Sequence, residues 1–431
     1  MENYIQQGQY YFINQVGDTV RSGRAPHYTI PYWLARQFAG KAVAGDFLSV
    51  VNIALDSTAI VCLGIMAFVL SAFPRIAFFT ILVAGAISTY VSNLTFITVP
   101  DGAAAALFMM GTFYYWKAYS FNKNAVRNIF LASFFFSWAV MLRPYLIVIL
   151  VLFALIYLIR KRPAITILHK LAVAGIFPLL LFMLPWVARN YNVTHRVIPF
   201  QQDVYAGYGY YPTEIQVRKL ITAMGEDGGT FWDPTAMASY YSPVVYKTSK
   251  YQYPPYLLKD SVFVHDLEKI RMEHIETFSR RTDSEENNVV IKAAALRSRY
   301  INNHPFRYYL SNPLRRTIKF WGHSGSYYIS LEGENNLFLW ANKLLQSLLY
   351  FLVLIAGTIG LLIVGKRNEF CWILLLPLII LTLMFPVIFG FMEPRYAIAF
   401  YYPSLLGLLL LCEYVVIKFH RKRMGLPVIS T

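Results

Sequence analysis

One carboxylate and three arginines are the side chains of this chain that could do chemistry at a membrane surface. Asp101 begins one long apolar run, while Arg143, Arg189 and Arg395 each stand where another run begins or ends. Charged groups beside hydrocarbon are costly, so they are candidates for function. Guanidinium groups bind phosphate oxygens through paired hydrogen bonds, and a carboxylate can take a proton from a hydroxyl or amine. Together they would suit a phosphate attached to a lipid.

Each of these residues also has a plainer explanation. Interfacial arginines extend to lipid headgroups and anchor helices, and Asp101 can cap the helix that it begins. We favour a functional site for the set, because the topology described below brings all four residues to one membrane face.

Other polar candidates point less clearly to chemistry. Asp56 lies inside an apolar run near Asn52, where a buried carboxyl that is hydrogen-bonded or protonated is expected. The histidines of the long polar segment lack HExxH spacing, and the three cysteines lie in apolar runs without zinc-ligand spacing. We therefore predict no metal site and no certain cofactor, although the use of a divalent metal stays open.

The composition is that of a membrane protein. Of the 431 residues, 57% are hydrophobic and 14% are charged, whereas soluble domains carry about 25% charged residues. The net charge of +16 does not indicate nucleic-acid binding, because the basic residues occupy short loops and do not form one stripe.

The apolar runs that could cross a bilayer as helices of roughly 20 residues number about nine. They lie near 47–72, 76–96, 102–118, 126–142, 144–160, 168–188, 340–365, 369–391 and 396–418. Arginine followed by proline makes a poor helix centre, so a tight turn is expected at Arg143-Pro144. We predict an all-α polytopic membrane protein with a mixed, mainly helical external domain.

Orientation follows from the basic loops. The strongest clusters are Arg160-Lys161-Arg162, Lys366-Arg367 and the tail from His420 to Arg423. If these are cytoplasmic, the spans alternate and Asp101 and the three arginines share the opposite face. The predicted parts are an external segment 1–46, a bundle 47–188, an external domain 189–338, a bundle 339–418 and a cytoplasmic tail 419–431.

The polar segment 189–338 is too long and too rich in charge to be a linker. Its first half reads as loops, while Val262–Arg280 and Asn288–Asn303 carry apolar residues at helical spacing. The two membrane halves show no sequence repeat, which counts against an inverted-repeat transporter.

Several strings, in order along the chain, resemble the integral-membrane C-type glycosyltransferases. The group meant is the one that uses polyprenyl-phosphate sugars and includes protein O-mannosyltransferases and lipid A aminoarabinose transferases. The strings are Gly23-Arg24-Ala25-Pro26-His27-Tyr28-Thr29-Ile30-Pro31-Tyr32, Pro100-Asp101-Gly102, Leu142-Arg143-Pro144, Pro185-Trp186-Val187-Ala188-Arg189-Asn190, the segment 295–310 with Asn303-His304-Pro305, and Pro394-Arg395-Tyr396.

This resemblance implies a role for each matched residue. Asp101 would act as a catalytic carboxylate, Arg143, Arg189 and Arg395 would hold the donor phosphate, and Arg24, His27 and Tyr28 would belong to a mobile substrate loop.

One feature departs from the family pattern. The family's first catalytic aspartate stands at the end of a preceding helix, just ahead of a tyrosine that here aligns with Tyr4. We therefore expect either a missing upstream helix or a substitute carboxylate at Glu2.

The function implied is transfer of a sugar from a polyprenyl-phosphate donor to a glycan, lipid or protein acceptor, with inversion at the anomeric carbon. The protein would be multi-pass, in the inner membrane if bacterial, with membrane lipids as partners and no nucleic acid. Two alternatives stay open: an O-antigen ligase or polymerase, and a non-catalytic transporter of lipids or glycans.

Overall fold

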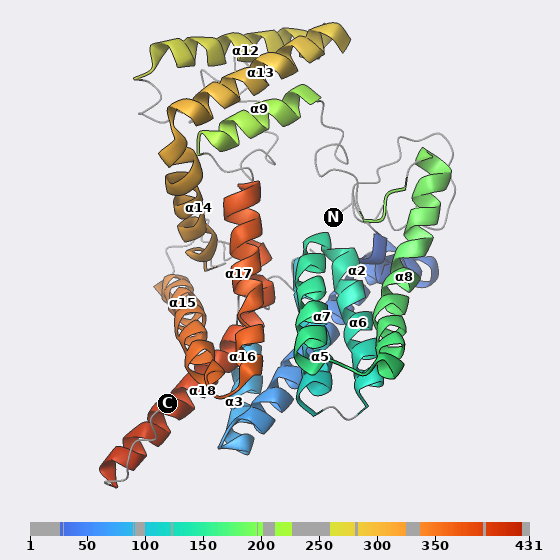
Figure 1. Ribbon diagram of the computed structural model, residues 1–431, viewed down its shortest axis with the longest axis vertical. Coiled ribbons are helices and arrows are strands. Elements are labelled where there is room, and N and C mark those ends of the chain that lie inside the picture. The colour runs from blue at the N-terminus through green and yellow to red at the C-terminus, as the bar shows by residue number, and fades with distance from the viewer. Residues whose placement is uncertain are drawn as a thin grey trace. The chain divides into compact units, whose positions relative to one another are not determined.

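The computed structural model describes residues 26–28, 30–88, 90, 100–121, 124–195, 197–200, 212–225, 259–280, 283–324, 337–390 and 394–424. All the regular elements in these ranges are helices. The chain forms two units (Figure 1): Met1–Gln202 with His323–Leu381 and Pro394–Thr431, and Asp203–Gly322 with Thr382–Glu393.

The first unit holds the apolar helices of the chain. They are α2 (Ile30–Leu70), α3 (Pro74–Ile87), α5 (Pro100–Phe121), α6 (Ala125–Leu142), α7 (Ile147–Lys161), α8 (Ile165–Thr194), α15 (Leu337–Gly365), α16 (Glu369–Ile373), α17 (Leu376–Thr382) and α18 (Ile398–Arg423). Short 3₁₀ turns precede α2, α7 and α18: η1 (Pro26–Tyr28), η2 (Pro144–Leu146) and η8 (Pro394–Ala397).

Within the described ranges, seven helical segments are long and apolar enough to cross a membrane. The prediction of an all-α, multi-pass integral membrane protein is therefore confirmed, whereas the count of nine stays a prediction. The other two predicted spans correspond to α3 and α5. The helix α3 ends at Ile87, where Ser88 takes an extended conformation. Residues 91–96 of this predicted span lie outside the described residues.

The helix α5 lies inside the first unit and is buried along nearly all of its length. Its 22 residues would span about 33 Å, enough for the hydrocarbon core. It packs against α2, α6 and α18, and α6 in turn packs against α8 (Figure 1). Between α5 and α6, Gly111 lets the Phe136 ring approach: a Cβ at Gly111 would lie 2.6 Å from that ring. Small residues of this kind allow close packing where lipid supplies no hydrophobic force.

The helices α15 and α18 cross with their backbones almost in contact. A Cβ at Gly360 would lie 1.8 Å from the carbonyl oxygen of Gly407, and one at Gly357 would lie 2.1 Å from that of Ser404. Only glycine fits at these points, so the crossing fixes the position of α18 against α15.

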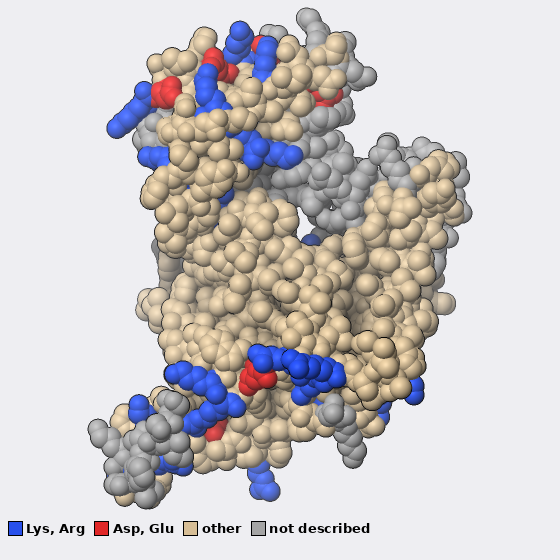
Figure 2. Space-filling model, viewed as in Figure 1, with Lys and Arg blue, Asp and Glu red and all other residues tan. Residues whose placement is uncertain are grey.

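The connections of the first unit lie at two opposite ends. At one end Arg160 of α7 pairs with Glu369 of α16 at 2.7 Å, and Lys161 lies over the Tyr119 ring of α5 at 4.4 Å. Figure 2 shows basic side chains gathered where α7 ends and α16 begins. The helices α5, α6, α7 and α8 alternate in direction, so the start of α5 and the end of α6 share the other end.

The second unit is a small helical domain. Its elements are α9 (Pro212–Ala223), α12 (Ser261–Arg280), α13 (Asp283–Asn303), α14 (Asn312–Trp321) and two π-helices, η5 (Arg307–Ser311) and η7 (Leu383–Phe389). The helices predicted at Val262–Arg280 and Asn288–Asn303 are thus present as α12 and α13.

The core of the second unit lies between α9, α12 and α13, which run side by side (Figure 1). Leu220, Phe263, Val289 and Tyr300 meet there, each at most 2% exposed. The helix α14 is joined to α9 by Asn312, whose Nδ2 donates to the Ala223 carbonyl at 3.0 Å. Buried apolar contacts and a satisfied amide therefore hold this unit together.

Candidate active site

The predicted carboxylate Asp101 lies in the first turn of α5 and is 1% exposed. Pro100 begins the helix, and proline suits that position because its fixed φ is helical and its missing N–H has no helical partner there. The carboxylate is also favoured by the partial positive charge of the helix start. Local sequence therefore accounts for where Asp101 stands.

Arg143 reaches Asp101 from the end of α6. Its backbone is extended, with φ −141° and ψ 91°, as expected for a residue before proline, and the chain then turns through η2 into α7. This is the tight turn predicted at Arg143-Pro144. The Arg143 Nη2 donates a hydrogen bond to Asp101 Oδ2 in an ion pair, with side chains 13% and 0% exposed.

Arg395 approaches the same carboxylate oxygen from η8, at the start of α18. Its Nε lies 3.8 Å from Asp101 Oδ2, and its side chain is 30% exposed. The structure thus brings together three of the predicted site residues from segments that are far apart in sequence.

Two tyrosines complete this cluster of Asp101, Arg143 and Arg395. The Tyr396 ring lies 5.6 Å from the Arg143 guanidinium and 5.7 Å from that of Arg395, and it meets the Tyr145 ring at 5.5 Å. Aromatic faces attract guanidinium groups and hold them in place. Tyr396 belongs to the matched string Pro394-Arg395-Tyr396, and Tyr145 directly follows the matched string Leu142-Arg143-Pro144. This position beside matched residues was the sequence signal that could have found them.

The charges of the cluster do not cancel. One carboxylate faces two guanidinium groups through a single oxygen, Oδ2, so one positive charge is left over. The other oxygen, Asp101 Oδ1, is buried and has no hydrogen-bond partner in the part of the chain that is described. The cluster can therefore accept an anion at its arginines and a hydrogen-bond donor at Oδ1.

Arg189 occupies a different environment near the end of α8. Its Nη1 donates to Asn190 Oδ1 at 3.0 Å, and its guanidinium lies 5.1 Å from the Trp186 ring. Asn190 Nδ2 donates to the Ile198 carbonyl at 3.0 Å, which holds the chain where it leaves the helix. Among the described residues, no hydrogen bond or ion pair joins Arg189 to Asp101.

Two members of the predicted substrate loop are buried in the first unit. The Nε2 of His27 donates to the Phe182 carbonyl of α8 at 3.1 Å, and the Tyr28 hydroxyl accepts from Asn52 Nδ2 of α2 at 3.0 Å. Burial lowers the pKa of His27 to about 4. Arg24 and Glu2, the other predicted members of the site, lie outside the described residues.

The carboxyl of Asp56 is hydrogen-bonded, as the sequence led us to expect. It accepts from the Tyr402 hydroxyl of α18, a partner that no local pattern indicates. Of the described residues, no three His, Cys, Asp or Glu side chains gather in a group that could hold a metal ion.

Comparisons with known proteins give one similarity of structure. No family model and no curated protein matches the chain by sequence. The chain is similar to the crystal structure of ArnT from Cupriavidus metallidurans bound to undecaprenyl phosphate, with 12% identity, a TM-score of 0.36, and coverage of 98% of this chain and 74% of that one. At this identity and TM-score the similarity concerns the fold alone.

Proposed function

We propose that this chain is a membrane glycosyltransferase that moves a sugar from a polyprenyl-phosphate donor to an acceptor at the cluster of Asp101, Arg143 and Arg395. The observation that carries the proposal is the convergence of two guanidinium groups on one oxygen of a buried carboxylate, beside apolar helices. An anchoring role alone does not call for two arginines on the same carboxylate.

The arginines would hold the donor phosphate. Guanidinium groups are planar forks that match phosphate oxygens, and they stay charged in any environment. Arg395 is the more exposed of the two, and its Nε lies 3.8 Å from Asp101 Oδ2, so it is the arginine that a phosphate entering the site would meet more readily. The polyprenyl tail would lie against the apolar surfaces of the neighbouring helices, within the bilayer.

The reaction would be a displacement at the anomeric carbon. The acceptor oxygen or nitrogen attacks that carbon while the bond from the carbon to the phosphate oxygen breaks, which inverts the configuration. The electron pair of the broken bond leaves on polyprenyl phosphate, where Arg143 and Arg395 stabilise the added negative charge. The proton lost by the acceptor goes to Asp101, whose Oδ1 is without a partner in the described part of the chain.

The remaining predicted residues have supporting roles in this proposal. Arg189 would hold the chain as it leaves α8 and would contribute positive charge from there. His27 and Tyr28 would fix one end of the substrate loop through their buried hydrogen bonds. Glu2 stays a candidate for a second carboxylate. The acceptor would be a glycan, a lipid or a protein.

Phosphate recognition can be tested without knowing the sugar or the acceptor. The purified protein would be titrated with a short polyprenyl phosphate and with the matching polyprenol, which lacks the phosphate. Losing a hydrogen bond to a charged group costs about 1.5–3 kcal/mol, so Arg395→Gln should weaken binding of the phosphate by about tenfold or more and leave polyprenol binding unchanged. Arg160→Gln is the matched control, because Arg160 is 62% exposed in a pair with Glu369 at the other end of the helices.

A change at Asp101 distinguishes binding of the donor phosphate from the chemical step. Asp101→Asn removes the negative charge beside the arginines, so it should keep or strengthen binding of polyprenyl phosphate while abolishing transfer in a membrane assay. Equal binding of phosphate and alcohol by the wild type, or full transfer by a correctly inserted Asp101→Asn protein, contradicts the assignment.

A further inference from the structure

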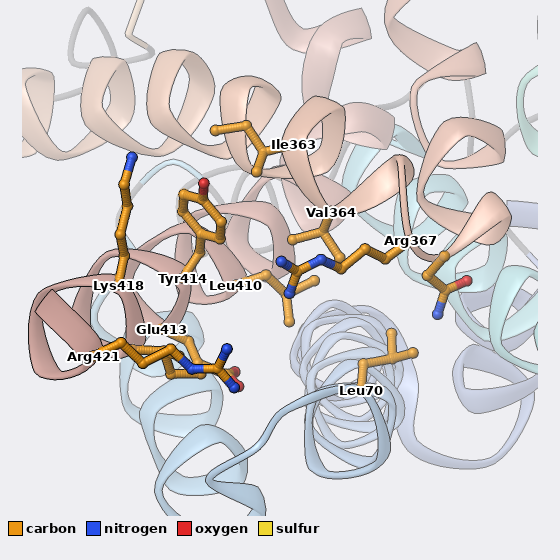
Figure 3. A pocket seen from close by; sticks show the side chains of 11 residues that line it. Leu70, Ile363, Val364, Arg367, Leu410, Glu413, Tyr414, Lys418 and Arg421 are labelled. Carbon is orange, nitrogen blue, oxygen red and sulfur yellow. The ribbon is translucent and has the colours of Figure 1, made fainter. Parts of the chain in front are cut away.

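A second charged cavity lies at the other end of the first unit. It has a volume of about 300 Å³ and is formed between α15 and α18 beside the last residue of α2 (Figure 3). Three basic side chains line it, from Arg367, Lys418 and Arg421, together with the carboxylate of Glu413. The proposed function uses none of these residues.

Two of the three basic side chains are directed at the cavity. Figure 3 shows the guanidinium groups of Arg367 and Arg421 pointing toward the space beside Leu70 and Leu410. The Arg367 guanidinium also lies 5.9 Å from the Tyr414 ring, as does the Lys418 ammonium. The Tyr414 ring thus lies close to two of the three cations, which its face attracts.

Among the described residues, one carboxylate lines the cavity, that of Glu413, and one of its two oxygens has a hydrogen-bond partner. Glu413 Oε1 accepts the backbone N–H of Ala72, which ties the turn after α2 to α18. Within the described ranges, no ion pair joins Glu413 to any of the three basic residues. The cavity therefore carries an excess of two positive charges, and an anion with hydrogen-bond acceptors would complement it.

The apolar residues of the cavity wall indicate what kind of molecule carries the anion. Leu70, Ile363, Val364, Leu410 and Ile417 line the same cavity as the charged groups. Apolar walls beside a basic rim, at the end of apolar helices, match a molecule with an anionic head and hydrocarbon chains. A free inorganic anion would leave the apolar surface without a partner.

We propose that this cavity binds the phosphate headgroup of an anionic membrane lipid. The inference is independent of the proposed function, because the two sites lie at opposite ends of the helices of the first unit. It places the lipid at the membrane face where the basic loops gather, which is the face expected to be cytoplasmic.

The test is a titration of the purified full-length protein with each candidate ligand, in which the bound ligand is measured by native mass spectrometry. Phosphatidylglycerol, phosphatidylcholine and inorganic phosphate would be compared. We expect phosphatidylglycerol to bind at least tenfold more tightly than either of the others. The double variant Arg367→Gln/Arg421→Gln should lose this preference.

The matched control is Lys366→Gln/Arg423→Gln, which removes the same charge from exposed residues outside the cavity wall. It should bind phosphatidylglycerol within about twofold of the wild type. Arg367→Lys/Arg421→Lys keeps the charge and guards against a folding defect, and it should retain part of the preference.

Three outcomes overturn the proposal. Equal loss in the control double variant means that general surface charge attracts the lipid. Equal binding of phosphatidylcholine means that the site does not select an anion. Binding of inorganic phosphate as tight as that of phosphatidylglycerol means that the site takes a soluble anion.

Discussion

Adding one methyl group at Gly360 should separate two helices of the first unit. Gly360 of α15 lies against the carbonyl oxygen of Gly407 of α18, and a Cβ there would come within 1.8 Å of that oxygen. The atom that the new Cβ would meet belongs to the backbone of α18, so no side chain can turn away to make room. The helices must move apart or bend if the residue is changed to alanine.

The size of the effect follows from that distance. Carbon and carbonyl oxygen lie about 3.3–3.6 Å apart even in close contacts, so the crossing must open by about 1.5 Å. Overpacking of this kind costs about 1–3 kcal/mol. Alanine favours a helix over glycine by about 1 kcal/mol, which offsets part of the cost. Gly360→Ala should therefore destabilise the protein slightly, and Gly360→Val by more.

Gly175 provides the matched control. It lies in α8, and a Cβ at that position would have no heavy atom within 4 Å, so Gly175→Ala should leave the thermal midpoint unchanged or raise it. The measurement is thermal unfolding of the purified protein in detergent, followed by tryptophan fluorescence. A Gly360→Val protein that unfolds at the wild-type temperature would refute the close crossing of α15 and α18.

Three further predictions concern buried polar groups. Asp101→Ala leaves Arg143 without its partner and should cost about 3–5 kcal/mol, and adding Arg143→Gln should restore part of the loss in a double-mutant cycle of thermal midpoints. Burial lowers the pKa of His27 from 6.5 to about 4, so between these two pH values the histidine takes up a proton in the unfolded chain but not in the folded protein. Stability should therefore be constant above pH 6.5 and fall by up to about 3 kcal/mol as the pH drops toward 4, whereas His27→Gln should flatten this dependence. Tyr402→Phe removes the hydrogen bond to Asp56 and should lower the thermal midpoint modestly, because such bonds between membrane helices contribute about 0.6 kcal/mol on average.

The helices of the first unit could be predicted because their signal is local. A run of apolar residues of the right length marks a span wherever it packs, and the spans predicted at 126–142 and 340–365 agree closely with α6 and α15. The turn at Arg143-Pro144 was predictable for the same reason, since proline restricts the residue before it.

The partners across the bundle could not be predicted in the same way. Asp56 and Tyr402 are joined although they stand in α2 and α18, and Arg395 meets Asp101 from a similar separation in sequence. The orientation of the helices, inferred from the basic loops, could place the site residues at one end of the bundle. It could not predict which of these residues contact one another. Arg189 was expected at the same site as Arg143, and the structure instead gives it partners on its own helix.

Burial is what distinguishes two ion pairs of the same chemical type. Arg160 and Glu369 pair at 2.7 Å but are 62% and 47% exposed, and water and salt reduce such a pair to about 0–1 kcal/mol. Asp101 is fully buried and is shared by two arginines, so loss of this carboxylate would be costly, because two cations beside the apolar helices would lose the negative charge that they share. A phosphate that entered there would add negative charge beside the two guanidinium groups that share this carboxylate. In the exposed pair of Arg160 and Glu369, by contrast, one positive charge faces one negative charge. The same residue types therefore form a surface contact at one end and a candidate phosphate site at the other.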